Sequence, residues 1–187
     1  MALDERDRVT ARHCSRVAGL SLELGAACSL SEGDLHILRT AAAFHDVGKI
    51  GIPDTVLLKV TRFTDDDWAI IKTHSAKSQR IILAADLDDG DTIGLIARHH
   101  HERYDGAGYP DGLAGEAIPI MARIVAMADT YDAMARTRVY RNGLPHDRIM
   151  RVLHDEQGRQ HDAYLFQKLV KLMTTSRYKA NPRAPRV

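Results

Sequence analysis

The sequence predicts an all-α fold, a single-domain bundle of about seven helices over residues 1–175. Apolar residues recur every three or four positions along most of the chain, as on the buried faces of amphipathic helices. We find no strand-like alternation of apolar and polar residues, no repeat and no linker between domains. The length of 187 residues suits one domain with a substantial core. The last segment, 176–187, is expected to form a disordered C-terminal tail.

Three helices are expected in the first half of the chain. The first covers about residues 6–24 and carries His13 on its apolar stripe. The second covers about residues 32–48, where the letters GKIGIP stop it. The third begins after Thr64, a capping residue, and has three aspartates in its first turn, where the helix dipole favours them. His74 lies on the inward stripe of this third helix.

Four more helices are expected in the second half. A short one covers residues 91–104, and the letters DGAGYPDGLAGEAIP over 105–119 predict a loop. A fifth helix, over 119–136, has proline in its first turn, where no backbone N–H is needed. Two further helices are expected near 146–157 and 161–175. Histidines therefore come from several helices that must share one core.

Composition excludes several classes of protein. The net charge is +1, which argues against a nucleic-acid polymer or a membrane surface as partner. No apolar run approaches the roughly 20 residues of a membrane span, and the N-terminus lacks the apolar core of a signal peptide. If one helix carried both Cys14 and Cys28, they would lie too far apart for a disulfide, and a reduced, cytoplasmic setting is the expectation.

Seven residues of metal-ligand type are expected to face the core from five helices. Each alone has an ordinary interpretation, since a single histidine on an apolar stripe is more often a hydrogen-bonded core residue. Together they would leave many buried polar groups to be satisfied separately, at a cost of roughly 2–7 kcal/mol for each one left unpaired. A shared site with two metal ions satisfies them jointly, because imidazole and carboxylate bind iron, manganese, zinc or nickel. The seven are His13, His45, Asp46, His74, His100, His101 and Asp129.

Other polar residues leave alternatives open. Lys49 either stabilises the end of a helix or contacts a phosphate. Arg138 and Arg141 form either a solvated turn or a match to a phosphate or a guanine edge. Tyr109 could stack on a base, meet a protein partner or only pack its loop. The glycines of this loop follow no predicted strand and lack a GK[ST] ending, which excludes the phosphate-binding loop of nucleotide-binding folds.

The ordered motifs resemble those of the HD-GYP family. The letters are HD followed by GKIGIPD, then HHERYDGAGYPDGL, ARIVAMADTYDAM and RVYR, and the resemblance covers about residues 5–175. HD-GYP proteins are a branch of the HD-domain metal-dependent phosphohydrolases, and they degrade the bacterial second messenger cyclic di-GMP. The resemblance implies the HD-domain fold for this chain.

The resemblance also implies roles for individual residues. The seven ligands named above match the family's dimetal set, with Asp46 as the bridge, which leaves His99 outside the site. Lys49 matches the lysine that faces the reacting phosphate, and Arg138 and Arg141 match positions that contact the dinucleotide. Members with three metals carry a glutamate at the position of Val9, so we expect two ions here. We expect iron or manganese, from the histidine and carboxylate set.

The expected activity is hydrolysis of cyclic di-GMP to linear pGpG, and possible further cleavage to GMP, by a water that two metals activate. Asp46 and Lys49 are the expected catalytic residues, and Lys49, Tyr109, Arg138 and Arg141 the expected substrate contacts. One alternative is a weakly active or inactive module that senses a cyclic dinucleotide or docks a diguanylate cyclase through Gly108, Tyr109 and Pro110. A second is hydrolysis of a hybrid cyclic dinucleotide or an alarmone, although the loop argues against alarmones.

Overall fold

The computed structural model describes residues 8–136 and 143–180, and side chains from residue 12 onward. These ranges hold eight α-helices, two short 3-10 helices and no β-strand, so the all-α prediction is confirmed. No helix in the described part is long and apolar enough to cross a bilayer. The helices are α2 (Arg8–Ala27), α3 (Glu32–Phe44), α4 (Asp54–Leu57), α5 (Asp65–Ala84), α6 (Gly90–His99), α7 (Ile120–Ala135), α8 (His146–Asp155) and α9 (Ala163–Leu172), with η1 (Val47–Gly51) and η2 (Gly115–Ala117) between them.

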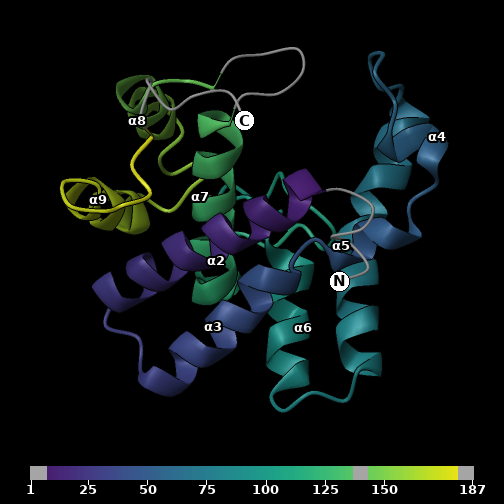
Figure 1. The fold of residues 1–187 in the computed structure, drawn as a ribbon, viewed down its shortest axis with the longest axis horizontal. Helices are drawn as coiled ribbons and strands as arrows, with labels where there is room; N and C mark the ends of the chain where they lie inside the picture. Colours follow the sequence, from purple (N-terminus) through teal and green to yellow (C-terminus); the bar gives the residue numbers. More distant parts are fainter. Residues whose placement is uncertain (1–7, 137–142, 181–187) are drawn as a thin grey trace.

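The helices pack around α2 and α7. α3 runs back beside α2, α7 crosses α2, and α5 and α6 form a hairpin next to α3 (Figure 1). α8 and α9 pack against α7 at one end of the molecule, whereas α4 lies at the other end (Figure 1). The side chains of Leu20, Leu38 and Ile124 are fully buried in the core between these helices.

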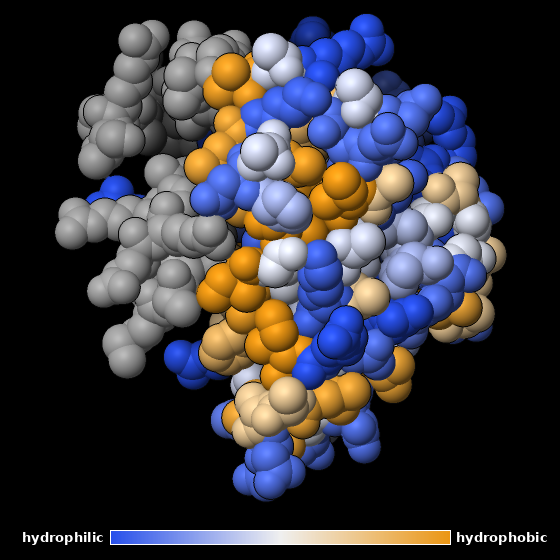
Figure 2. Space-filling view, turned by 90° about the vertical axis from the view of Figure 1, so that its right-hand side faces the viewer, coloured by the Kyte–Doolittle hydropathy of each residue, from blue (hydrophilic) through white to orange (hydrophobic). Residues whose placement is uncertain are grey.

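Helix α5 buries an unusually polar face. Its buried residues include His74, Ser75 and Ser78. Large apolar side chains of the α4–α5 region lie in solvent instead, with Leu58 68% and Trp68 50% exposed. The face that Figure 2 shows has a band of apolar surface among polar side chains. Because a helix normally buries its apolar face, this inversion indicates that α5 faces a polar site inside the fold.

Capping explains where α5 begins. The hydroxyl of Thr64 accepts a hydrogen bond from the backbone N–H of Asp67, and the Asp67 carboxylate accepts one from the backbone N–H of Thr64. This reciprocal pair is a capping box, which satisfies two backbone donors that the helix itself cannot. The predicted start after Thr64 is confirmed.

The largest differences from the predicted bounds are the early ends of α3 and α6 and one short helix, α4, that was not expected. α3 ends at Phe44 rather than near Gly48, because the chain turns into η1, which packs on α5. A Cβ on Gly48 would lie 2.0 Å from the carbonyl oxygen of His74, so only glycine permits this approach. α6 ends at His99, and α4 forms just after Pro53.

Part of the expected tail belongs to the packed structure. The Ser176 hydroxyl donates to the Glu23 carboxylate at 2.5 Å, and the Ala180 N–H donates to the Tyr131 hydroxyl at 2.9 Å. The rest of the predicted tail, residues 181–187, lies outside the described residues. The domain boundary at 175 stays a prediction.

Candidate metal centre

The seven predicted ligands meet where α2, α3, α5, α6 and α7 converge. His45 is fully buried, and His13, Asp46, His74 and His100 are each at most 7% exposed. His45 and Asp46 occupy the turn between α3 and η1, whereas His100 and His101 follow the end of α6. The helix ends that were predicted too late therefore place ligands on turns, where neighbouring side chains can converge.

Three of the histidines share one hydrogen-bonding arrangement. In His45, His74 and His100, Nδ1 lies 2.6–2.7 Å from the carbonyl oxygen of the residue three positions earlier. A carbonyl only accepts, so each Nδ1 carries the proton, and in the neutral ring Nε2 holds a free lone pair. All three Nε2 atoms are buried without a hydrogen-bond partner, as is Oδ1 of Asp46. Such unpaired buried atoms are costly without a ligand, and this donor set fits a metal ion.

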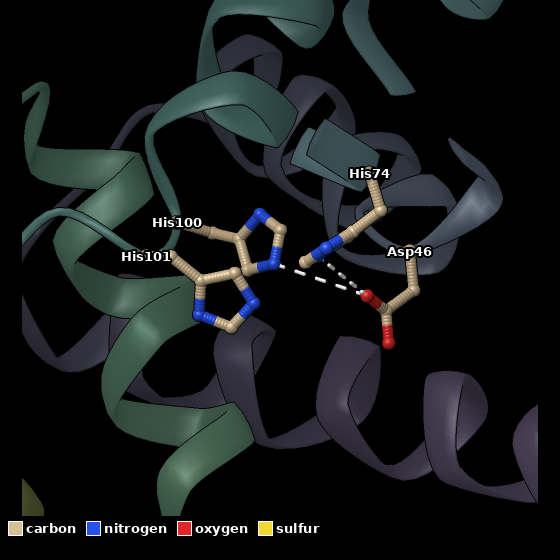
Figure 3. A group of neighbouring side chains, drawn as sticks. All are labelled: Asp46, His74, His100 and His101. Atoms are coloured by element: carbon tan, nitrogen blue, oxygen red, sulfur yellow. Dashed lines mark ion pairs between the residues drawn. The ribbon is translucent and has the colours of Figure 1, made fainter. Parts of the chain in front are cut away.

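The two carboxylate oxygens of Asp46 face different neighbours. Oδ1 lies 3.3 Å from Nε2 of His74 and 3.9 Å from Nε2 of His100 (Figure 3). Oδ2 lies 2.5 Å from Nζ of Lys49 and 3.5 Å from Nε2 of His45. Ligand atoms form two compact groups, and Asp46 belongs to both. The groups are Asp46, His74, His100 and His101, and His13, His45 and Asp46.

His13 is oriented by carboxylates. Its Nε2 lies 3.1 Å from Asp129, and its Nδ1 lies 2.6 Å from Asp132, whose other contacts are to the Arg16 guanidinium at 2.6 and 3.1 Å. Burial lowers the pKa of His13, but its hydrogen bonds to the two aspartates outweigh this and raise the pKa to about 9. Asp132 was missed from the sequence, although it lies one helical turn after Asp129.

Comparison with known proteins decides the family. The family model described as HD domain matches residues 1–165. The chain belongs to the HD domain family. The predicted resemblance to the HD-GYP branch is confirmed by its relatives. One is the cyclic di-GMP phosphodiesterase response regulator RpfG of Xanthomonas campestris, 38% identical over 91% of this chain and 45% of that protein. Another is 3'3'-cGAMP-specific phosphodiesterase 2 of Vibrio cholerae, 34% identical over 91% of this chain and 33% of that protein.

A solved structure confirms the HD-domain fold. The crystal structure of a cyclic GMP-AMP specific phosphodiesterase of V. cholerae matches 92% of this chain and 46% of its own, with a TM-score of 0.71 and 19% identity. The chain spans less than half the length of the curated relatives described above. What the comparisons share with this chain is therefore the HD domain itself.

Among the five histidines of the predicted ligand set, His101 is the one whose ring forms no hydrogen bond with the described residues. It stacks on Tyr109 instead, with ring centroids 4.9 Å apart and planes at 30°, and it also contacts His74 and His100. Burial, and then the nearby His74 ring, lowers the pKa of His101 to about 3. Its ring is therefore neutral at physiological pH and ready to bind a metal, whereas His13 would have to release a proton on binding one.

The loop that carries Tyr109 is fastened to the segment that follows α6. A Cβ on Gly108 would lie 2.3 Å from the backbone nitrogen of Arg103, so the close approach requires glycine. Oε1 of the buried Glu102 accepts hydrogen bonds from the backbone N–H groups of Asp111 and Gly112, at 2.7 and 3.1 Å. Glu102 was also missed from the sequence, although its letter belongs to the HHE motif.

His99 lies outside the two ligand groups that share Asp46, as the resemblance implies. Its Nε2 lies 2.8 Å from the Asp111 carboxylate, which also accepts two hydrogen bonds from Arg98 at 2.6 Å. His99, Glu102 and Asp111 form a third group of metal-ligand type. Arg98 already neutralises Asp111 and occupies both of its oxygens, so we interpret this group as a fastening of the loop.

The basic residues predicted to contact substrate divide into two cases. Lys49 has a side chain 32% exposed beside the cluster. Burial lowers its pKa, but the charge of Asp46 outweighs this and raises the pKa above its ordinary value, so Lys49 is a cation. Arg138 and Arg141 lie outside the described residues.

Proposed function

We propose that this HD domain is a metal-dependent phosphodiesterase that hydrolyses cyclic di-GMP to linear pGpG, with possible further cleavage to GMP. The observation that carries the proposal is the pair of buried ligand groups that share Asp46. The curated name of the X. campestris relative supports cyclic di-GMP as the substrate. A cytoplasmic location is proposed with it, and the two free thiols of Cys14 and Cys28 fit that setting.

The residues of the two groups, with Asp129 beside His13, would hold two divalent ions, and Asp46 would bridge them. Iron or manganese suits this set of imidazole and carboxylate ligands. Bound ions of this kind polarise phosphate oxygens and lower the pKa of a coordinated water toward neutrality. Val9 lies in α2 one turn before His13, so the position of the third-metal glutamate offers no carboxylate. Two ions per chain is the expected stoichiometry.

Lys49, Arg138 and Arg141 would supply the positive charges that stabilise a bound phosphodiester. Lys49 lies at the edge of the cluster, where its ammonium can pair with a nonbridging phosphate oxygen or assist the leaving oxygen. Arg138 and Arg141 would contact the dinucleotide from the segment after α7, and charge-assisted hydrogen bonds of arginine suit phosphate and guanine edges. Tyr109 is the remaining proposed substrate contact, on the loop beside His101.

Two alternatives make different predictions. A sensing or docking module would bind a dinucleotide, or a diguanylate cyclase through Gly108, Tyr109 and Pro110, without turnover. A phosphodiesterase for a hybrid dinucleotide is favoured by the V. cholerae relative named for 3'3'-cGAMP. The lysine cation beside two ligand groups favours an enzyme over a silent module, because binding alone needs no paired metal site.

The test combines metal analysis with an assay. Protein purified without oxygen is loaded with Fe²⁺ or Mn²⁺, its metal content is measured, and cyclic di-GMP and 3'3'-cGAMP are supplied in parallel. We expect two ions per chain and release of pGpG, with chelator-treated protein inactive. Bound metal with tight dinucleotide binding and no turnover would establish the sensing module instead. Faster turnover of 3'3'-cGAMP would reassign the substrate.

A further inference from the structure

His101 is oriented differently from the other histidines of the metal centre. Hydrogen bonds that Nδ1 donates orient the rings of His13, His45, His74 and His100. The described residues provide no such bond to His101. Its ring stacks on Tyr109, with centroids 4.9 Å apart and planes at 30°. The orientation of this ligand therefore depends on an aromatic face supplied by the loop.

Tyr109 is itself held from several sides. Its backbone N–H donates to the carbonyl of His101 at 3.3 Å, and its ring is half-buried. The ammonium of Lys72 lies 5.5 Å from the centroid of the Tyr109 ring, within the range of a cation–π interaction. The tyrosine is thus placed against His101 by the protein alone, before any substrate binds.

Glu102 secures the loop just beyond Tyr109. Its Oε1 accepts the N–H groups of both Asp111 and Gly112, and its side chain is 4% exposed. Because Glu102 directly follows His101, one short segment carries the ligand and also fixes the loop that stacks on it.

We propose that Tyr109 is a positioning residue that orients the metal ligand His101, and that Glu102 keeps it in place. The proposal rests on the metal centre of the proposed function, and it gives the Tyr109 ring a role that precedes substrate binding. Partners that orient a metal ligand typically change metal affinity by about 10- to 100-fold when they are removed.

The experiment measures Mn²⁺ affinity in the full chain, by competition with a chelator and without any dinucleotide. Tyr109→Ala removes the stacking face, and we expect about 10- to 100-fold weaker binding. Tyr109→Phe retains the face and removes only the hydroxyl, so we expect Mn²⁺ affinity close to that of the wild type. Tyr178→Ala is the control, because it removes a partly buried ring that packs on Gly19 and not on a histidine.

A second pair of variants tests the anchor. Glu102→Gln retains a carbonyl oxygen that can accept both backbone N–H groups, whereas Glu102→Ala retains none. We expect Glu102→Ala to weaken Mn²⁺ binding and to speed hydrogen exchange at the amides of Asp111 and Gly112. Glu102→Gln should keep both the Mn²⁺ affinity and the slow hydrogen exchange of the wild type.

The outcomes separate this proposal from the proposed function. A wild-type chain that binds no Mn²⁺ or Fe²⁺ contradicts the metal centre itself. If the wild type binds metal and Tyr109→Ala binds it equally well, the positioning role is wrong while the metal centre stands. Equal losses in Tyr109→Phe and Tyr109→Ala would assign the effect to the hydroxyl and would also overturn the role of the ring.

Discussion

The histidines of the centre fall into two classes that differ in what orients them. His45, His74 and His100 are oriented by backbone carbonyls three residues earlier in their own segments. His13 is oriented by the side chain of Asp132, which lies 119 residues away from it in the sequence. His101 is oriented by the ring of Tyr109. Backbone-held ligands keep their orientation when distant side chains change, whereas side-chain-held ligands can be weakened one at a time.

Asp46→Ala should have the largest effect, because Asp46 belongs to both ligand groups and serves both classes. We expect turnover to fall to background and most bound metal to be lost, as measured by product assay and metal analysis of the purified variant. Asp46→Asn is the matched control for shape, since it retains one carbonyl oxygen and loses the charge. A variant Asp46→Ala that kept both metal and turnover would show that the dimetal assignment is wrong.

Arg138→Ala and Arg141→Ala should spare both classes of ligand and weaken substrate binding. A charge-assisted hydrogen bond contributes about 1.5–3 kcal/mol, so the loss of one predicts roughly 10- to 150-fold weaker binding. Michaelis constants and metal content are measured on the same preparations. Unchanged Michaelis constants in both variants would indicate that these arginines lie in solvent and do not contact the substrate.

Asp132→Ala separates the two classes most directly. It removes the carboxylate from Nδ1 of His13 and leaves Arg16 without its partner, so we expect about 10- to 100-fold weaker binding of one ion. The second ion, on the His74 side of Asp46, should stay bound in a titration that resolves two sites. Asp162→Ala is the control, because it breaks another buried aspartate–arginine pair, with Arg123 at 2.5 Å. Equal loss of both ions would indicate a general loss of structure.

The same division explains what could be predicted from the sequence. The positions of His13, His45 and His74 could be predicted because polar residues stood on apolar helical stripes or beside an apolar run. The partners that orient His13 and His101 could not, since they depend on how α7 and the 105–119 loop pack against α2 and α6. The ends of α3 and α6 were predicted too late because tertiary contacts, such as that of Gly48 with α5, decide where those helices stop.

The histidines held by backbone carbonyls should respond to changes in the contacts that hold their own segments in place. Ser78→Ala tests this, and it should affect Mn²⁺ affinity less than Asp46→Ala or Asp132→Ala does. The hydroxyl of Ser78 accepts the N–H of Gly48 at 2.8 Å, which joins α5 to the turn that carries Asp46 and Lys49. Ser78 and Gly48 are both buried, so the variant leaves the buried N–H of Gly48 unpaired. We expect the free energy of unfolding to fall by about 1–3 kcal/mol in denaturant titrations of metal-free protein.

Ser75→Ala is the matched control for that measurement. Ser75 is also fully buried on α5, but its hydroxyl donates to the Lys72 carbonyl within the same helix, at 3.1 Å. Alanine is the best helix former and leaves no backbone donor unpaired, so we expect a change of less than about 1 kcal/mol.

Mn²⁺ affinity in Ser78→Ala should fall less than in Asp132→Ala, because the carbonyls that orient His45 and His74 stay in their own segments. A larger loss of Mn²⁺ affinity in Ser78→Ala would show that the backbone-held ligands depend on distant contacts as much as His13 does.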